Sequence, residues 1–164
     1  MKRLIITLCL TISLAMGSFG IGLSGDFQKG LDAAQRGDYN TALKEWTSLA
    51  EQGDAKAQFN LGIMYERGQG VLRDYKTAVK WYKLASEQGF AKAQYNLGGM
   101  YALGQGVIED KVYAHMWANI LNSNGYEDGK KIMDYLLEQG ITPSQIEEAQ
   151  SLARECVKKE YKSC

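Results

Sequence analysis

The stretch LGIMYERGQGV, at Leu61–Val71, returns thirty-six residues later as LGGMYALGQGV, at Leu97–Val107. The residues before it repeat too, since EQGDAKAQFNLG at Glu51–Gly62 matches EQGFAKAQYNLG at Glu87–Gly98. Self-similarity at a period of about 20–50 residues is typical of solenoids built from small repeated units. The alternative interpretation of a doubled glycine-rich segment is a pair of phosphate-binding loops.

The residues around the glycines distinguish these two interpretations. A phosphate-binding loop follows an apolar strand and ends in Gly-Lys-Ser/Thr, and neither condition is met here. In G-Q-G-V the first glycine follows a helical pattern, where a left-handed C-terminal residue is expected, and the second lets the chain reverse. Asp74 and Asp110 then stand where a second helix needs an N-cap. Each unit is therefore predicted to be two helices joined by a glycine turn.

Apolar residues recur at helical spacing in both predicted helices of a unit, as in Ala57, Leu61 and Met64. Gly62 and Gly98 fall inside a helix, where glycine costs about 1 kcal/mol relative to alanine. We therefore expect two helices to approach closely at these glycines, with large aromatic side chains filling the adjacent space.

The predicted fold is all-α, an αα-hairpin solenoid with a C-terminal helical cap. The boundaries are a signal peptide at 1–24, a shortened first hairpin at 26–53, full repeats at 54–89 and 90–125, and degenerate capping helices with a tail at 126–164. Terminal repeats are often atypical in this way. The last helix has a clear predicted start, with Thr142 as N-cap, Pro143 at the first position and Gln145 completing a capping box.

The first residues have the pattern of a secretory signal peptide. Lys2 and Arg3 precede an apolar run at Leu4–Met16, which is shorter than the roughly 20 residues that span a bilayer. Three cleavage points fit the small residues that follow: Gly17, Gly20 and Ser24. We expect an exported protein without a stable membrane anchor after cleavage, and an uncleaved anchor is the alternative.

The charge balance argues against nucleic acid as a partner. The chain has 19 basic and 19 acidic residues, and without the first 25 residues 17 basic residues face 19 acidic ones. Nucleic-acid binding needs a concentrated positive field, which this balance does not provide.

The cysteines indicate a cross-linked tail. Cys9 lies in the predicted signal peptide, which leaves Cys156 and Cys164 as an even pair in an exported chain. Residues eight apart in one helix are separated by about 12 Å along its axis, too far for a disulfide. A bond therefore requires the last helix to end near Lys158–Glu160 and the tail to fold back. Two free thiols and an intermolecular bond are the alternatives.

The doubled pattern A-x-A-Q-[FY]-N-L-G-x-M-Y-x-x-G-x-G-V-x-x-D-x-x-x-A-x-x-W resembles the Sel-1-like repeat, a relative of the tetratricopeptide repeat. The first hairpin, with G-D-Y-x-x-A-L, is more similar to the tetratricopeptide form. The likeness covers roughly residues 26–125, and the final segment TPSQIEEAQSLARECVKKEYKSC resembles the tail of many small exported bacterial members. The resemblance implies an αα solenoid that organises protein assemblies. Together with the signal pattern, it leads us to expect a periplasmic or secreted bacterial scaffold that binds another protein or peptide, as a monomer or with weak self-association. The resemblance implies no specific reaction and no cofactor.

The resemblance also suggests ligand contacts on the concave face that the first helices of the repeats line. Asn60 and Asn96 share one register, and in peptide-binding tetratricopeptide domains an asparagine there contacts the ligand backbone. An amide suits a peptide main chain because it both donates and accepts hydrogen bonds. The alternative is that these asparagines brace neighbouring turns.

Aromatic and basic residues flank the asparagines in the same register. Phe27, Phe59 and Tyr95 each precede the asparagine register by one position, which suggests an aromatic ladder, although they also suit a core. Lys56 and Lys92 lie one turn earlier, where they would receive a carboxylate.

Catalytic and metal-binding residues are not indicated. His115 is the single histidine, which fits a packing or surface role better than a Cys-His pair, and two cysteines alone are not a zinc site. Some cysteine-rich exported relatives are described as penicillin-binding or β-lactam-hydrolysing, so an envelope-associated hydrolase is the alternative function. The chain contains no S-x-x-K, the motif of serine acylation. We therefore expect no enzyme, no metal and no cofactor.

Overall fold

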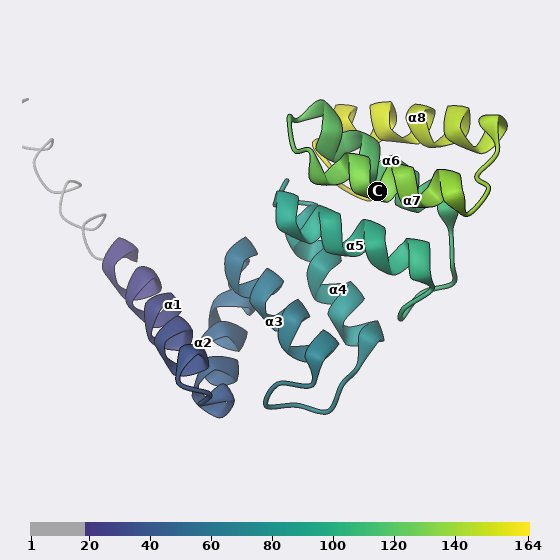
Figure 1. Cartoon of the computed structure of the whole chain (residues 1–164). Helices are drawn as coiled ribbons and strands as arrows, with labels where there is room; N and C mark the ends of the chain where they lie inside the picture. The colour runs from purple at the N-terminus through teal and green to yellow at the C-terminus, as the bar shows by residue number, and fades with distance from the viewer. Residues whose placement is uncertain (1–18) are drawn as a thin grey trace, which may run out of the picture.

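The computed structural model describes residues 19–164, and in this part of the chain it contains eight helices and no strand (Figure 1). The helices are α1 (Phe19–Gln35), α2 (Tyr39–Glu51), α3 (Ala55–Arg67), α4 (Tyr75–Ser86), α5 (Ala91–Leu103), α6 (Lys111–Ser123), α7 (Asp128–Glu138) and α8 (Pro143–Lys158). The predicted all-α fold is confirmed. Of the predicted signal peptide, residues 1–18, with Cys9 and Gly17, lie outside the described part.

Helices that follow one another along the chain pack on one another, from α1 through to α7. Figure 1 shows the resulting stack of hairpins running from α1 to the upper right of the molecule. The end of the stack differs, because α7 and α8 both pack against α6 instead of forming a hairpin of their own. The predicted helical cap is thus made of two helices that share one neighbour.

The glycine turns have the predicted backbone conformations. Gly68 and Gly104 end α3 and α5 in the left-handed region, with φ of 69° and 63°. Gly70 and Gly106 also have positive φ, of 73° and 72°. Residues other than glycine rarely adopt such values, so the two glycines of each turn are required by the backbone itself.

The second glycine of each turn also has a packing role that sequence reasoning missed. A Cβ on Gly106 would overlap the carbonyl of Tyr75 and lie 2.8 Å from the nitrogen of Lys76. Gly70 lies against the backbone of Tyr39 in the same way. Each long turn therefore docks on the first residue of the second helix of the preceding hairpin.

The helix starts follow the predicted capping rules. Asp74 accepts a hydrogen bond from the Thr77 nitrogen at 3.2 Å, and Asp110 accepts one from the Tyr113 nitrogen at 3.0 Å. At α8 the Thr142 side chain and the Gln145 side chain bond each other's backbone nitrogens, which is the capping box expected there.

The helix-interior glycines lie at close helix contacts, as predicted, but the aromatic ring expected beside them is present at Gly62 and absent at Gly98. A Cβ on Gly62 would lie 2.5 Å from Cδ1 of Tyr82, and one on Gly30 would lie 2.8 Å from Cδ1 of Trp46. In the third hairpin Ala118 stands in the register of Tyr82, and Ile132 of α7 reaches Gly98 instead. Helix α7, through Ile132, thus fills the space that an aromatic ring fills in the other hairpins.

Buried glutamines join each hairpin to the one before it. Gln58 donates to the carbonyl of Ala50 at 3.1 Å, and Gln94, one repeat later, donates to the carbonyl of Ser86 at 3.3 Å. Both glutamines are less than 5% exposed. Because a buried polar group without a hydrogen bond is costly, these residues fix the register between neighbouring hairpins.

Candidate functional site

A pocket of about 270 Å³ lies between the first helices of the second and third hairpins and the start of the cap. It is lined by Phe59, Ala91, Lys92, Tyr95, Asn96, Leu121, Tyr126 and Asp128. Four of the six predicted contact residues, Phe59, Lys92, Tyr95 and Asn96, are therefore brought together here. Lys56 and Asn60, their counterparts one repeat earlier, are not among the lining residues.

One wall of the pocket is the first turn and a half of α5. Lys92, Tyr95 and Asn96 are three and four residues apart, and this spacing places them on one face of the helix. Lys92 is exposed, and Tyr95 remains 37% exposed although it is aromatic. An exposed aromatic ring next to a lysine and an amide is a surface that can contact a partner.

Two of the three residues suggested for an aromatic ladder pack on rings of neighbouring helices, which is the alternative that the sequence also allowed. Phe27 packs on Trp46, with ring centroids 6.1 Å apart. Phe59 packs on Tyr82 at 5.8 Å and on Phe90 at 5.2 Å. Both rings are partly buried against the core because a large aromatic residue lies beside each of them, and Phe59 also lines the floor of the pocket.

Asn96 lines the pocket and also interacts with Tyr82, one member of a partly buried polar pair. The hydroxyl of Tyr82 donates to the carboxylate of Glu66. Burial and this bond raise the pKa of Tyr82, and the amide of Asn96 opposes the rise because it hydrogen-bonds the phenolate form. Tyr82 therefore stays protonated, and Asn96 has a structural neighbour as well as access to the pocket.

The opposite wall comes from the end of α6 and the start of α7. Tyr126 is 50% exposed, and Leu121 is buried behind it. Asp128 is paired with Lys131 at 2.6 Å, and this contact raises the pKa of Lys131. The pocket thus has an apolar and aromatic interior with a lysine on one wall and a carboxylate on the other.

A second pocket, of about 410 Å³, lies between α6 and α8. Its lining residues are Asn119, Ile120, Ser123, Gln150, Ala153, Arg154, Val157 and Lys158. Three of them lie in the repeat at 90–125, but none occupies the register of the first helices that gave the predicted contacts. We therefore treat the smaller pocket as the candidate site.

His115 is buried, as a packing histidine would be. Its Nδ1 is 2.9 Å from Nδ2 of Asn119, and burial lowers its pKa below the ordinary value of 6.5. Among the described residues there is no group of three or more side chains that could hold a metal ion. The burial of His115 and its contact with Asn119 are typical of a structural residue.

The burial of His115 predicts a pH-dependent stability. The unfolded chain binds a proton at His115 more readily than the folded one, so stability is complete above about pH 6.5 and falls as the pH decreases below it. Thermal unfolding at pH 7.5 and pH 5.5 should show a smaller loss for His115→Gln than for the unmodified protein. An equal loss in both would show that other groups cause it.

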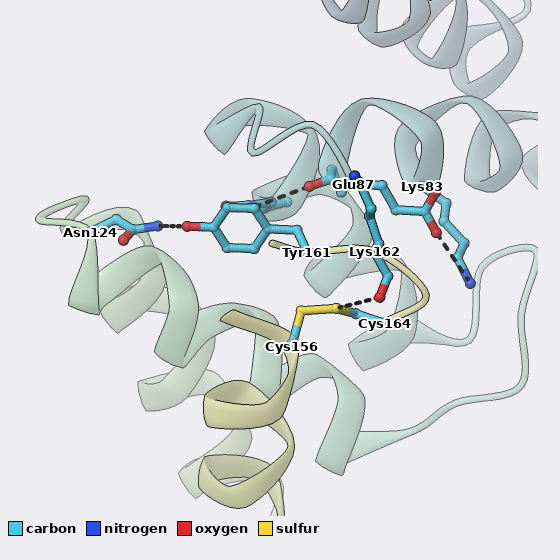
Figure 2. The surroundings of a disulfide bond; sticks show 9 residues. Lys83, Glu87, Asn124, Cys156, Tyr161, Lys162 and Cys164 are labelled. Atoms are coloured by element: carbon cyan, nitrogen blue, oxygen red, sulfur yellow. Dashed lines mark hydrogen bonds and ion pairs between the residues drawn. A yellow bond between two sulfur atoms is a disulfide. The ribbon is translucent and has the colours of Figure 1, made fainter. Parts of the chain in front are cut away.

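The two cysteines of the tail form a disulfide. Their Cα atoms are 5.5 Å apart, and α8 ends at Lys158, as a bond between them requires (Figure 2). No helix in residues 19–164 has the length and apolar character needed to cross a membrane.

Comparison with known proteins identifies the repeats. The Sel1 repeat model matches residues 55–90 and 91–126. A Sel1 repeat protein from Oxalobacter formigenes is 33% identical and has a TM-score of 0.62, and the match covers 69% of this chain and 89% of that one. The chain belongs to the Sel1-repeat family. Sel1-repeat proteins generally act as scaffolds for protein–protein interaction and are typically not enzymes.

A larger solved structure with the Sel1-like repeat fold is also similar to this chain. This is c5321, a protective antigen present in uropathogenic Escherichia coli strains, with 28% identity and a TM-score of 0.78. The match covers 85% of this chain but 30% of the antigen, so the present chain corresponds to less than a third of its length. No curated protein gives a significant match.

Proposed function

We propose that this Sel1-repeat protein binds a segment of a partner protein in the pocket between α3, α5 and α7. The observation that carries the proposal is that residues chosen from the repeat register line one pocket together with Tyr126, an exposed aromatic residue at the start of the cap. Apolar pockets with a few well-placed polar groups are the usual form of a binding site.

The lining suggests how such a segment binds. An apolar or aromatic side chain of the partner enters between Tyr95 and Tyr126, over the ring of Phe59. The amide of Asn96 hydrogen-bonds the partner's main chain, and Lys92 attracts an acidic group. Lys56 and Asn60, in the second hairpin, extend the contact along the concave face if the segment is long enough to reach them.

We also propose that the protein is exported, which suits the same function. The signal pattern of the first residues directs the chain to the periplasm or the exterior, where a disulfide such as Cys156–Cys164 persists. A small cross-linked scaffold with an open pocket is suited to hold an envelope or secreted protein there.

The test is capture of a partner by purified tagged protein, from a periplasmic extract of the source bacterium. Lys92→Ala with Asn96→Ala should reduce the amount of the dominant captured protein roughly tenfold, which corresponds to the loss of about one net polar contact. The exposed Lys80 on α4 lies outside the pocket, so Lys80→Ala is the matched control. Unchanged capture by the pocket variant, with an unchanged melting temperature, would contradict the proposal.

The contribution of the second repeat can be measured in the same assay. Lys56→Ala with Asn60→Ala changes the same register one repeat earlier, outside the pocket. We expect a loss of capture smaller than that of the Lys92 and Asn96 variant. An equal or larger loss would show that the site is centred on α3 instead of α5.

A further inference from the structure

The last six residues fold back from the end of α8 in a conformation that depends on local restraints. Glu160, Tyr161 and Ser163 have positive φ values of 51°, 65° and 58°. Residues with side chains adopt this left-handed region infrequently. The disulfide and a hydrogen bond from the Tyr161 nitrogen to the Cys156 carbonyl, 2.9 Å long, hold the segment in place.

This arrangement places Tyr161 across two neighbouring turns. A Cβ on Gly89, in the turn between α4 and α5, would lie 3.2 Å from the tyrosine ring. The Tyr161 hydroxyl accepts a hydrogen bond from Nδ2 of Asn124, in the turn between α6 and α7, at 3.2 Å (Figure 2). One side chain of the tail thus joins two turns that are thirty-six residues apart.

The repeat register explains why these turns need such a connection. Gln88 donates a hydrogen bond to Oε1 of Gln58 at 2.8 Å and so connects the turn between α4 and α5 to the first turn of α3. The equivalent pair one repeat later is Asn124 and Gln94, but asparagine is one methylene shorter than glutamine. Asn124 bonds Tyr161 instead, and Oε1 of Gln94 is buried without a hydrogen-bond partner in the described protein.

The two turns also carry the two walls of the candidate pocket. Gly89 precedes Phe90, which packs on the pocket floor at Phe59. Asn124 lies two residues before Tyr126 of the opposite wall. We propose that the disulfide-bonded tail is a clamp, in which Tyr161 replaces the missing glutamine contact and fixes the separation of the pocket walls. Its effect on partner affinity rests on the proposed function, but the clamp itself does not.

Hydrogen exchange of the full chain tests the clamp without a ligand. In Tyr161→Ala, amides of the segments 86–92 and 122–128 should exchange roughly three- to tenfold faster, the range expected for loss of about one net hydrogen bond. The turn at 68–74, which Tyr161 does not contact, is the internal control. Cys164→Ser should produce the same pattern, because it releases the tail while leaving α8 intact.

A compensating substitution distinguishes the specific loss of the clamp from a general loss of stability. Adding Asn124→Gln to Tyr161→Ala supplies the longer amide that can reach Oε1 of Gln94, as Gln88 reaches Gln58, and should restore slow exchange at 122–128. Unchanged exchange in Tyr161→Ala, or faster exchange spread equally to 68–74, would overturn the clamp. If exchange changes as expected but no partner is captured even by the unmodified protein, the proposed function fails and the clamp stands.

Discussion

Replacement of Gly106 by alanine should lower the free energy of unfolding by about 3 kcal/mol. This value combines the cost of a left-handed conformation for a residue with a side chain and the cost of an overpacked contact. The residue has φ of 72°, and its Cβ would overlap the carbonyl of Tyr75 at the start of α4. The backbone of a helix start cannot move aside as a flexible side chain can. Urea unfolding monitored by circular dichroism measures the loss.

The control for this change is Gly125→Ala. Gly125 has φ of 83°, but a Cβ there meets nothing within 4 Å. Only the conformational penalty of about 1–2 kcal/mol should therefore remain. Equal losses in the two variants would show that the long turn does not dock on the preceding hairpin.

The second large effect is expected for Gly62→Ala, with a loss of about 2–3 kcal/mol from overpacking. The added methyl group would lie 2.5 Å from Cδ1 of Tyr82. That ring is fully buried and its hydroxyl is bonded to Glu66, so it has no free space into which to turn. The same unfolding measurement gives the size of the effect.

Gly99→Ala is the matched control, because Gly99 is also inside a helix but has nothing within 4 Å of its Cβ position. Alanine there should stabilise the protein by about 0.5–1 kcal/mol through its better helix propensity. Opposite signs for the two alanine substitutions are thus expected. A loss at Gly99 as large as at Gly62 would contradict the close helix packing described here.

The features that follow from local chemistry could be predicted from the sequence. A helix end in the left-handed conformation favours glycine, as at Gly68 and Gly104. A helix start favours a residue that caps its free backbone nitrogens, such as Asp74 or Thr142. These rules depend on a few neighbouring residues, and the period of thirty-six residues repeats the same signal. The hairpins, their turns and the start of α8 were therefore predictable.

The features that depend on distant contacts could not be predicted. The repeat register gave one wall of the pocket, but Tyr126 and Asp128 of the other wall lie in the degenerate cap, where the pattern is lost. Phe59 suited both an exposed ladder and a core, and the sequence did not show that Tyr82 and Phe90 lie beside its ring. Only the packing between hairpins decides such cases.

We propose that a segment of a partner protein occupies the pocket beside α5. The most direct measurement replaces Tyr95 with a photo-crosslinking phenylalanine derivative in living cells, with the same replacement at Leu84 on α4 as control. Leu84 is 43% exposed and lies outside the pocket, so it tests for random collisions. We expect one dominant cross-linked protein from position 95, absent at position 84 and reduced by Lys92→Ala with Asn96→Ala. Equal cross-linking from both positions, or none from position 95, would contradict the claim.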